Sequence, residues 1–195
     1  MIYYANITNA TLRVRESRII ADLLLQKAGR DKWHREIFEN NILQIKSEKS
    51  IISIAQLIRR RLETMNTELW EMVRDGDKIL VTQCLFGCAI KHSRLIGDFL
   101  CIYIKDQKNI FTTKLAKKMW TEYLSDCRGR DPDMKHWSDA TTAKLRSIVW
   151  SMLAETGYIQ DIRNPILQNV FIDEKLCDYL RRHNEKYVLQ CMELE

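Results

Sequence analysis

The sequence contains few turn-forming residues: two Pro and six Gly among 195 residues. This scarcity excludes a collagen-like or low-complexity chain, and together with the abundant Leu, Ile, Lys, Arg and Glu it favours a mainly helical protein. Hydrophobic residues make up 46% of the sequence, which is enough to bury a core in one or two domains.

Long hydrophobic runs are also missing. The longest apolar stretch, residues 79–90, is shorter than the ~20 apolar residues that a bilayer needs. Charged residues follow it directly, so we predict a buried core helix here. Residues 1–10 lack the basic start and the apolar run of a secretory signal, and the six cysteines are irregularly spaced. We therefore expect a cytoplasmic protein with reduced thiols and no membrane association.

Signatures of catalysis are absent as well. There is no G-x-S-x-G, P-loop, H-E-x-x-H or G-x-G-x-x-G motif. Cys84, Cys88 and His92 recur at i, i+4 and i+8, but no fourth ligand accompanies them, so buried thiols explain the spacing better than a metal does. Asp131 and Asp133 flank a proline and indicate a turn rather than a nuclease site. We expect no enzymatic activity, no cofactor and no metal.

The positive charge is concentrated at the start of the chain. Residues 1–64 hold 12 Lys and Arg against 7 Asp and Glu, whereas residues 65–195 hold 19 of each, so the net charge of +5 lies in the first third. A second basic region, residues 78–118, holds 8 Lys and Arg against 2 Asp and Glu. Such an excess allows an anionic partner but does not require one.

Residues 47–62 (SEKSIISIAQLIRRRL) predict an amphipathic helix that begins at a serine and ends in three arginines. Apolar residues recur at i, i+4, i+7 and i+11 from Ile51, and polar residues recur at the same spacing from Lys49 on the opposite side. Two shorter helices are predicted before it, near residues 17–28 and 31–40. Three helices in succession, the third of them basic, are what a helix-turn-helix domain needs.

We expect this helix to contact duplex DNA. Its cations would bind phosphates and its small polar side chains would approach base edges. The three arginines lie about 100° apart around the helix, so at least one of them is expected to be structural. The alternative is a solvated helix whose arginines pair with nearby acids. With a second basic set beyond residue 110, the candidate DNA contacts are Lys49, Ser50, Ser53, Gln56, Arg59, Arg60, Arg61, Lys114, Lys117 and Lys118.

The rest of the sequence predicts a second helical domain. Residues 66–77 are acidic and indicate a connection, which places a boundary near Gly76. We therefore predict a helix-turn-helix-like domain over residues 1–76 that packs on a helical domain over residues 77–195. Further helices are predicted for residues 77–105, 139–156 and 173–189, and a loop for residues 127–135.

A small β ribbon is predicted near the C-terminus. Residues 158–159 and 170–172 favour short strands around Asn164 and Pro165. A helix followed by a short ribbon is typical of the end of a winged-helix unit, so residues 138–172 are a possible winged-helix element. The predicted fold class is accordingly mainly α, with helix-turn-helix or winged-helix character.

Four segments, in this order and spacing, resemble the BrxA family: ESRIIADLLL, ENNILQIKSEKSIISIAQLIRRRLETM, AIKHSRLIGDFL and WSDATTAKLRSIVWSMLAETGYI. BrxA proteins are accessory components of bacteriophage-exclusion (BREX) defence systems. The resemblance covers most of the chain and includes no catalytic signature. It implies a non-enzymatic, mostly helical protein that binds double-stranded DNA in a multi-protein defence system. Two alternatives remain open: an adaptor that assembles other defence-system proteins, and a helical RNA-binding domain of the antitermination type.

Overall fold

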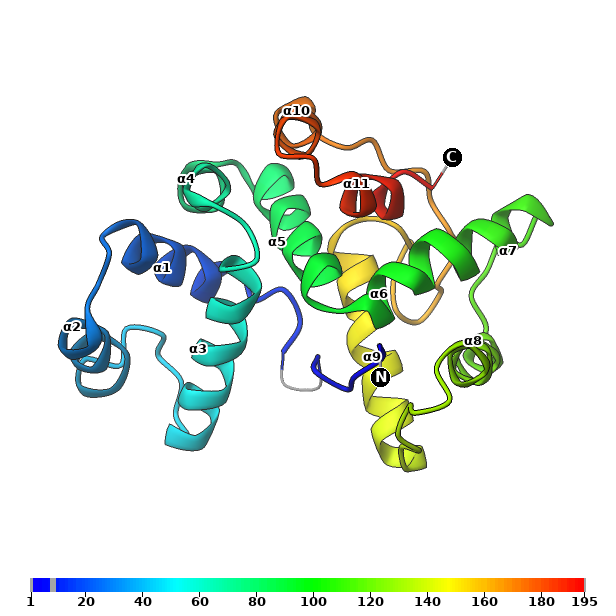
Figure 1. The fold of residues 1–195 in the computed structure, drawn as a ribbon, viewed down its shortest axis with the longest axis horizontal. Helices are drawn as coiled ribbons and strands as arrows, with labels where there is room; N and C mark the ends of the chain where they lie inside the picture. Colours follow the sequence, from blue (N-terminus) through cyan, green and yellow to red (C-terminus); the bar gives the residue numbers. More distant parts are fainter. Residues whose placement is uncertain (1, 8–9, 195) are drawn as a thin grey trace.

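The computed structural model describes residues 2–7 and 10–194. These residues form a mainly helical protein, as the composition predicts (Figure 1). Two short segments, η1 (Arg35–Glu39) and η2 (Phe99–Ile104), have the wider π-helical turn. The α-helices are α1 (Val14–Leu25), α2 (Arg30–His34), α3 (Glu48–Leu62), α4 (Thr67–Asp75), α5 (Lys78–His92), α6 (Arg94–Asp98), α7 (Lys105–Asn109), α8 (Lys117–Arg130), α9 (Asp139–Glu155), α10 (Glu174–Arg182) and α11 (Lys186–Met192).

Helix α5 lies at the centre of the fold. All of residues 80–90 are buried, and α5 contacts α1, α3 and α4 as well as α6, α10 and α11 (Figure 1). The carboxylate of Asp77 caps its start by accepting a hydrogen bond of 3.0 Å from the Leu80 N–H. The prediction of a buried core helix over residues 79–90 is confirmed. Among the described residues no single helix is long and apolar enough to cross a membrane; α5 reaches that only together with the helix that follows, which is bent from it by 106°.

Helix α4 occupies the segment that was predicted to be an acidic connection. Asn66 caps it by accepting a hydrogen bond of 3.1 Å from the Glu68 N–H. Leu69 and Val73, one turn apart, are fully buried, and the helix packs on α1 and α5. The prediction was wrong because the acidic residues occupy only the outer side of an amphipathic helix.

The three helices that precede α4 follow the predicted succession. Helix α1 packs on α3, and η1, which continues α2, also contacts α3. The connection from η1 to α3, residues 40–47, is longer than the roughly three- or four-residue turn of a helix-turn-helix unit. Three helices therefore occur in the predicted order, without the tight turn between the last two that a helix-turn-helix unit has.

The C-terminal half contains a long, well-capped helix, α9. The Ser138 hydroxyl accepts a hydrogen bond of 3.3 Å from the Thr141 N–H, as a cap at that residue predicts. The helix stops before Gly157, whose φ of +82° lies in the left-handed region that favours glycine. The helix predicted for residues 173–189 is interrupted, because Asn184 adopts a φ of +56° between α10 and α11.

The predicted β ribbon is not formed in the described part of the chain. Only two isolated antiparallel bridges occur there, Lys114 with Ile166 and Ile159 with Leu167. The predicted strands 158–159 and 170–172 do not pair with each other. The Asp161 carboxylate instead accepts the backbone N–H groups that follow it and holds the segment as a turn. This corrects the ribbon, and with it the winged-helix element over residues 138–172.

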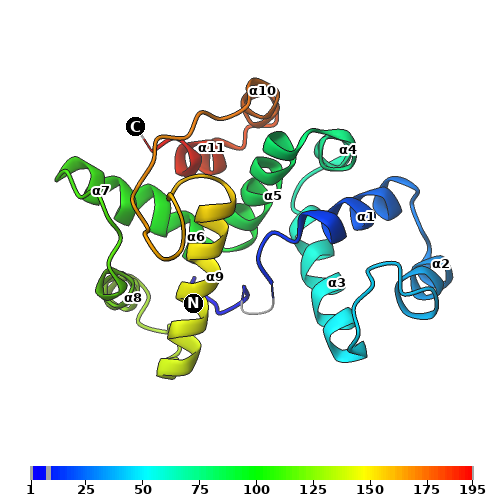
Figure 2. The ribbon, with the colours of Figure 1, turned by 180° about the vertical axis from the view of Figure 1, so that it is seen from behind.

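Residues 2–7 cross to the C-terminal half of the molecule. The Tyr3 hydroxyl donates to the Asp98 carboxylate (2.8 Å), and the Tyr3 N–H donates to Asp131 (3.2 Å). Both ribbon views place the start of the chain beside α9 (Figures 1 and 2). The division at residue 76 stays a prediction, but the first residues pack on elements beyond it.

Candidate nucleic-acid interface

Helix α3 has the amphipathic character that its spacing predicts. Ile51, Ile58 and Leu62 on the apolar stripe are at most 4% exposed and pack into the core. On the opposite side Lys49, Gln56 and Arg60 are exposed, and Ser50 and Ser53 are half-buried. Glu48 is the only acidic residue in the first turn, and three arginines occupy the last turn. The helix therefore presents a polar, mainly cationic face to solvent.

Arg61 does not belong to this face. Its side chain is 4% exposed, and its guanidinium donates hydrogen bonds to the carbonyl oxygens of Thr11 (2.7 Å) and Ala10 (3.1 Å). Burial lowers the pKa of Arg61 to about 10. The prediction that Arg61 contacts DNA is corrected: it fastens the segment before α1 to α3, the structural role that the angular spacing required of at least one arginine.

Arg59 and Arg60 differ in the interactions that their side chains make within the protein. Arg59 forms an ion pair with Glu63 (2.7 Å), and its guanidinium lies 4.7 Å from the centre of the Trp33 ring. Arg60 is exposed, and among the described residues its side chain has no hydrogen bond or ion pair. Arg60 is therefore the arginine most free to bind an external anion.

The polar face of α3 opens into a groove of about 460 Å³. One wall comes from α3 through Ser53, Gln56 and Arg60; the other comes from residues 4–6 and from His92 at the end of α5. The lining contains no carboxylate. Three predicted contacts, at i, i+3 and i+7 on α3, thus share one concave surface.

Tyr4, Asn6 and His92 were not predicted as part of this site. Asn6 is anchored beside His92 because its side-chain amide donates to the His92 carbonyl oxygen (3.0 Å). No local sequence signal marks Tyr4 and Asn6, since they reach the groove only through the crossing of residues 2–7. The Ser53 hydroxyl donates to the Ser50 carbonyl oxygen (3.2 Å), which leaves its lone pairs as acceptors.

The pKa of His92 is lowered by its surroundings. Burial lowers its pKa below the ordinary value, and the positive charges of Arg61 and Arg60 lower it further. The imidazole is therefore neutral near neutral pH. A phosphate placed in the groove would oppose the arginine charges and favour the protonated imidazole, so anion binding there would be coupled to proton uptake at this residue.

The second predicted basic set lies elsewhere. Lys114, Lys117 and Lys118 are exposed around the start of α8, and α8 and α3 lie toward opposite ends of the longest axis (Figure 1). Lys118 approaches Glu122 at 3.7 Å. Lys114 and Lys117 line a separate cavity of about 290 Å³. The structure therefore does not bring the two predicted basic sets together on one surface.

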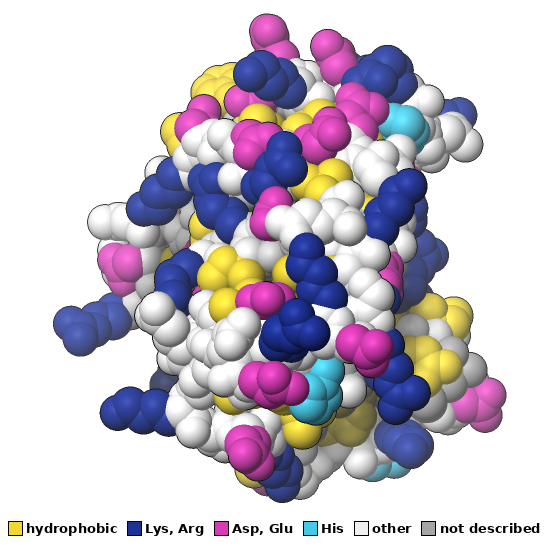
Figure 3. Space-filling model, turned by 90° about the vertical axis from the view of Figure 1, so that its left-hand side faces the viewer, with side chains coloured by type: hydrophobic (Ala, Val, Ile, Leu, Met, Phe, Trp, Pro, Cys, Tyr) yellow, Lys and Arg dark blue, Asp and Glu magenta, His cyan; other side chains and the backbone are white. Residues whose placement is uncertain are grey.

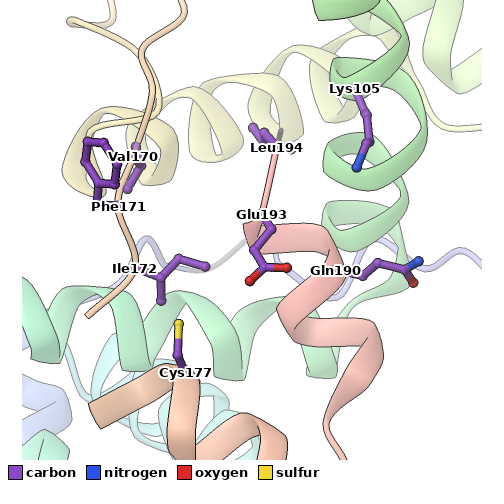
Figure 4. Close-up of a pocket in the computed structure, with 8 residues that line it drawn as sticks. All are labelled: Lys105, Val170, Phe171, Ile172, Cys177, Gln190, Glu193 and Leu194. Carbon is purple, nitrogen blue, oxygen red and sulfur yellow. The ribbon is translucent and has the colours of Figure 1, made fainter. Parts of the chain in front are cut away.

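The surface around the N-terminal helices is mixed in charge. Figure 3 shows basic and acidic side chains interleaved on the side where α1 to α3 lie. An anionic partner would therefore meet separate cations on this side rather than a continuous basic surface. Another cavity, of about 400 Å³ beside residues 170–172, combines the cation of Lys105 with the carboxylate of Glu193 (Figure 4). Its balanced charge does not favour a polyanion.

Two thiols that precede His92 on α5 are buried. Cys84 and Cys88 are inaccessible to solvent, and burial raises the pKa of both, that of Cys88 to about 12. In the described part of the chain no group of three His, Cys, Asp or Glu side chains is placed to hold a metal ion. The side chains that line the groove supply hydrogen-bonding groups and positive charge.

Comparison with known proteins identifies the family. The BrxA family matches residues 1–184. BREX protein BrxA from Paramagnetospirillum magneticum is 44% identical over 98% of this chain and 96% of that protein, and BREX protein BrxA from Escherichia coli O9:H4 is 29% identical over 98% and 90%. A crystal structure of an uncharacterized protein from Magnetospirillum magneticum has a TM-score of 0.94 and 43% identity over the whole of both chains. The chain therefore belongs to the BrxA family of BREX anti-phage proteins.

Proposed function

We propose that this protein is a non-enzymatic, cytoplasmic component of its BREX system that binds duplex DNA through the polar face of α3. The observation that carries the proposal is the groove beside α3. Ser53, Gln56 and Arg60 line it, and its lining contains no carboxylate. Bound DNA phosphates would face an unpaired guanidinium without a competing negative charge. Helix α3 would serve as the recognition helix of a helix-turn-helix-like unit with an extended turn.

The dimensions of the helix suit this role. Its exposed face runs from Lys49 to Arg60, about 16 Å at a rise of ~1.5 Å per residue. An α-helix of this kind fits the major groove of B-DNA, which is about 12 Å wide. In that arrangement Lys49 and Arg60, near the two ends of the face, bind phosphates, while Ser53 and Gln56 lie between them toward the base edges.

The experiment is a salt titration of binding to a labelled duplex, with single-stranded DNA and RNA of the same sequence in parallel. We expect a duplex preference and an affinity that falls linearly in a plot of log affinity against log salt. Lys49→Ala with Arg60→Ala should weaken duplex binding by about tenfold or more and reduce the salt slope by about two. Lys175→Ala with Lys186→Ala removes the same charge from α10 and α11 and should change neither quantity.

Exposed apolar side chains favour a second candidate, an adaptor for other defence-system proteins. Phe111 is 90% exposed, Phe171 85% and Ile79 68%. Ile79 and Phe171 line the same pocket, and an exposed apolar patch of this kind is a common site of protein contact. The same titration separates the candidates. Absence of binding to all three nucleic acids at low salt would support the adaptor, and a preference for RNA would support the antitermination-type alternative.

A further inference from the structure

The cavity beside the start of α8 is lined by four cations and no acid. Lys114 and Lys117 come from the segment that enters α8, Arg146 from α9, and Arg163 from the loop after α9. Among the described residues none of these four side chains forms a hydrogen bond or an ion pair. Like charges gathered around one cavity repel each other, and a bound anion would relieve that repulsion.

The backbone around the cavity adds to its positive character. Asp161 is the carboxylate of the loop that carries Arg163, but it accepts the backbone N–H groups of Arg163 and Asn164 at 2.7 Å and does not line the cavity. Helix α8 begins at Lys117 with no acidic residue in its first turn, and the Ala116 N–H before it donates to the neutral Met119 sulfur (3.1 Å) rather than to a carboxylate. The positive end of its dipole therefore lies at a residue that lines the cavity.

The cavity is larger and more apolar than a phosphate ion requires. Its volume of about 290 Å³ approaches the lower end of the range of small-molecule sites. Buried Leu115, Trp150 and Pro165 supply apolar surface to the same lining, together with Ile162, which is 52% exposed. This combination matches a ligand with a charged group at one end and a flat or apolar body at the other.

We propose that this cavity binds a small phosphorylated ligand with an apolar or aromatic body, of the size of a nucleoside monophosphate. The phosphate lies among Lys114, Lys117, Arg146 and Arg163, and the body of the ligand lies against Trp150 and Leu115. The site is separate from the α3 groove and does not depend on DNA binding there. It assigns Lys114 and Lys117 to a small ligand rather than to a DNA surface.

The test is isothermal titration of the full chain, in separate experiments, with adenosine 5′-monophosphate, adenosine and inorganic phosphate at low salt. We expect the nucleotide to bind about tenfold or more tightly than either adenosine or phosphate, because only the nucleotide engages both halves of the cavity. Arg146→Gln with Arg163→Gln should weaken nucleotide binding by about tenfold or more. Arg30→Gln with Arg35→Gln removes the same charge from the exposed α2–η1 region and should leave the nucleotide affinity unchanged.

Thermal unfolding establishes that each variant is folded. If the Arg146 and Arg163 variant is not, Lys114→Gln with Lys117→Gln tests the same cavity at two exposed positions. A nucleotide that binds no better than adenosine overturns the proposal, and so does nucleotide binding that the cavity variants do not weaken. If the protein does not bind the nucleotide and the cavity variants lose duplex affinity, the proposal is also overturned, and the cavity is identified as part of a second DNA surface. The Lys49 and Arg60 variant should keep its nucleotide affinity, so failure of this site and failure of the α3 interface are distinguishable.

Discussion

Adjacent arginines of α3 are expected to have opposite roles. Arg61→Ala should destabilise the protein while leaving the duplex affinity of the folded molecules unchanged. Arg60→Ala should lower the affinity and keep the free energy of unfolding within about 0.5 kcal/mol of the parent value, because exposed side chains without partners contribute little to stability. The contrast follows from their environments, since Arg61 is 4% exposed and Arg60 lies on the solvent side of the helix.

The size of the Arg61 effect follows from three contributions. The substitution removes two charge-assisted hydrogen bonds to the carbonyl groups of Ala10 and Thr11, each of about 1.5–3 kcal/mol. It also removes buried methylene groups at about 0.8 kcal/mol each. In the opposite direction, the charged guanidinium incurs a desolvation penalty on burial, which lowers the Arg61 pKa to about 10 and which alanine does not incur. We therefore expect Arg61→Ala to lower the free energy of unfolding by about 2–4 kcal/mol.

Urea denaturation, followed by tryptophan fluorescence and far-UV circular dichroism, measures this difference. Duplex affinity is then compared under conditions in which both variants are at least nine-tenths folded, as the denaturation curves define. An Arg61 variant as stable as the parent would refute the structural role of this residue. A folded Arg61 variant that loses as much affinity as the Arg60 variant would refute its exclusion from the interface.

Two further predictions concern the groove and the packing of α6. Lowering the pH through the His92 titration should strengthen duplex binding by about two- to fivefold, because phosphate favours the protonated imidazole, and His92→Gln should abolish the dependence in binding assays across that range. The free protein has the opposite trend: the His92 pKa is lower folded than unfolded, so its contribution to stability is lost as the pH falls below about 6.5. Gly97→Ala should lower the free energy of unfolding by about 1–3 kcal/mol, because an added Cβ would lie 2.1 Å from the Tyr187 hydroxyl oxygen. Gly129→Ala in α8 meets nothing within 4 Å and should instead raise stability by up to about 1 kcal/mol, so equal thermal shifts for the two variants would contradict this account.

Features that depend on local periodicity were predictable. The spacing of Ile51 and Ile58 predicted the buried stripe of α3, and the largely apolar run of residues 79–90 predicted the core of α5. The sequence also indicates that Arg61 is buried, because it lies seven residues after Ile54 and three after Ile58 and therefore on the same face of the helix. Its charge concealed that pattern, since an arginine is seldom buried without partners and its partners lie 50 and 51 residues away.

Features that depend on distant contacts were not predictable. The groove needs Asn6 beside His92, 86 residues apart, and no periodic pattern links them. The ribbon was expected from the β propensity of residues 158–159 and 170–172, but strands this short are stable only with a partner. Across the Asp161 turn, residues 158–160 instead pair with residues 166–168 in an isolated bridge, and residues 170–172 are left outside it. The shared cavity of Lys114 and Arg163 was not predictable either, because only the folded chain brings their two segments together.

The crossing of residues 2–7 has a consequence for the order of folding. The Tyr3 N–H donates to a carboxylate 128 residues further along, so during synthesis the docking of this segment, which also uses His92 and Asp98, is complete only after Asp131 has left the ribosome. At about 5–20 residues per second, that delay is several seconds or longer. Helix α3 is able to form early from local contacts, whereas the second wall of its groove depends on partners that are synthesised later. The interface would thus be completed only after more than half of the chain has been made.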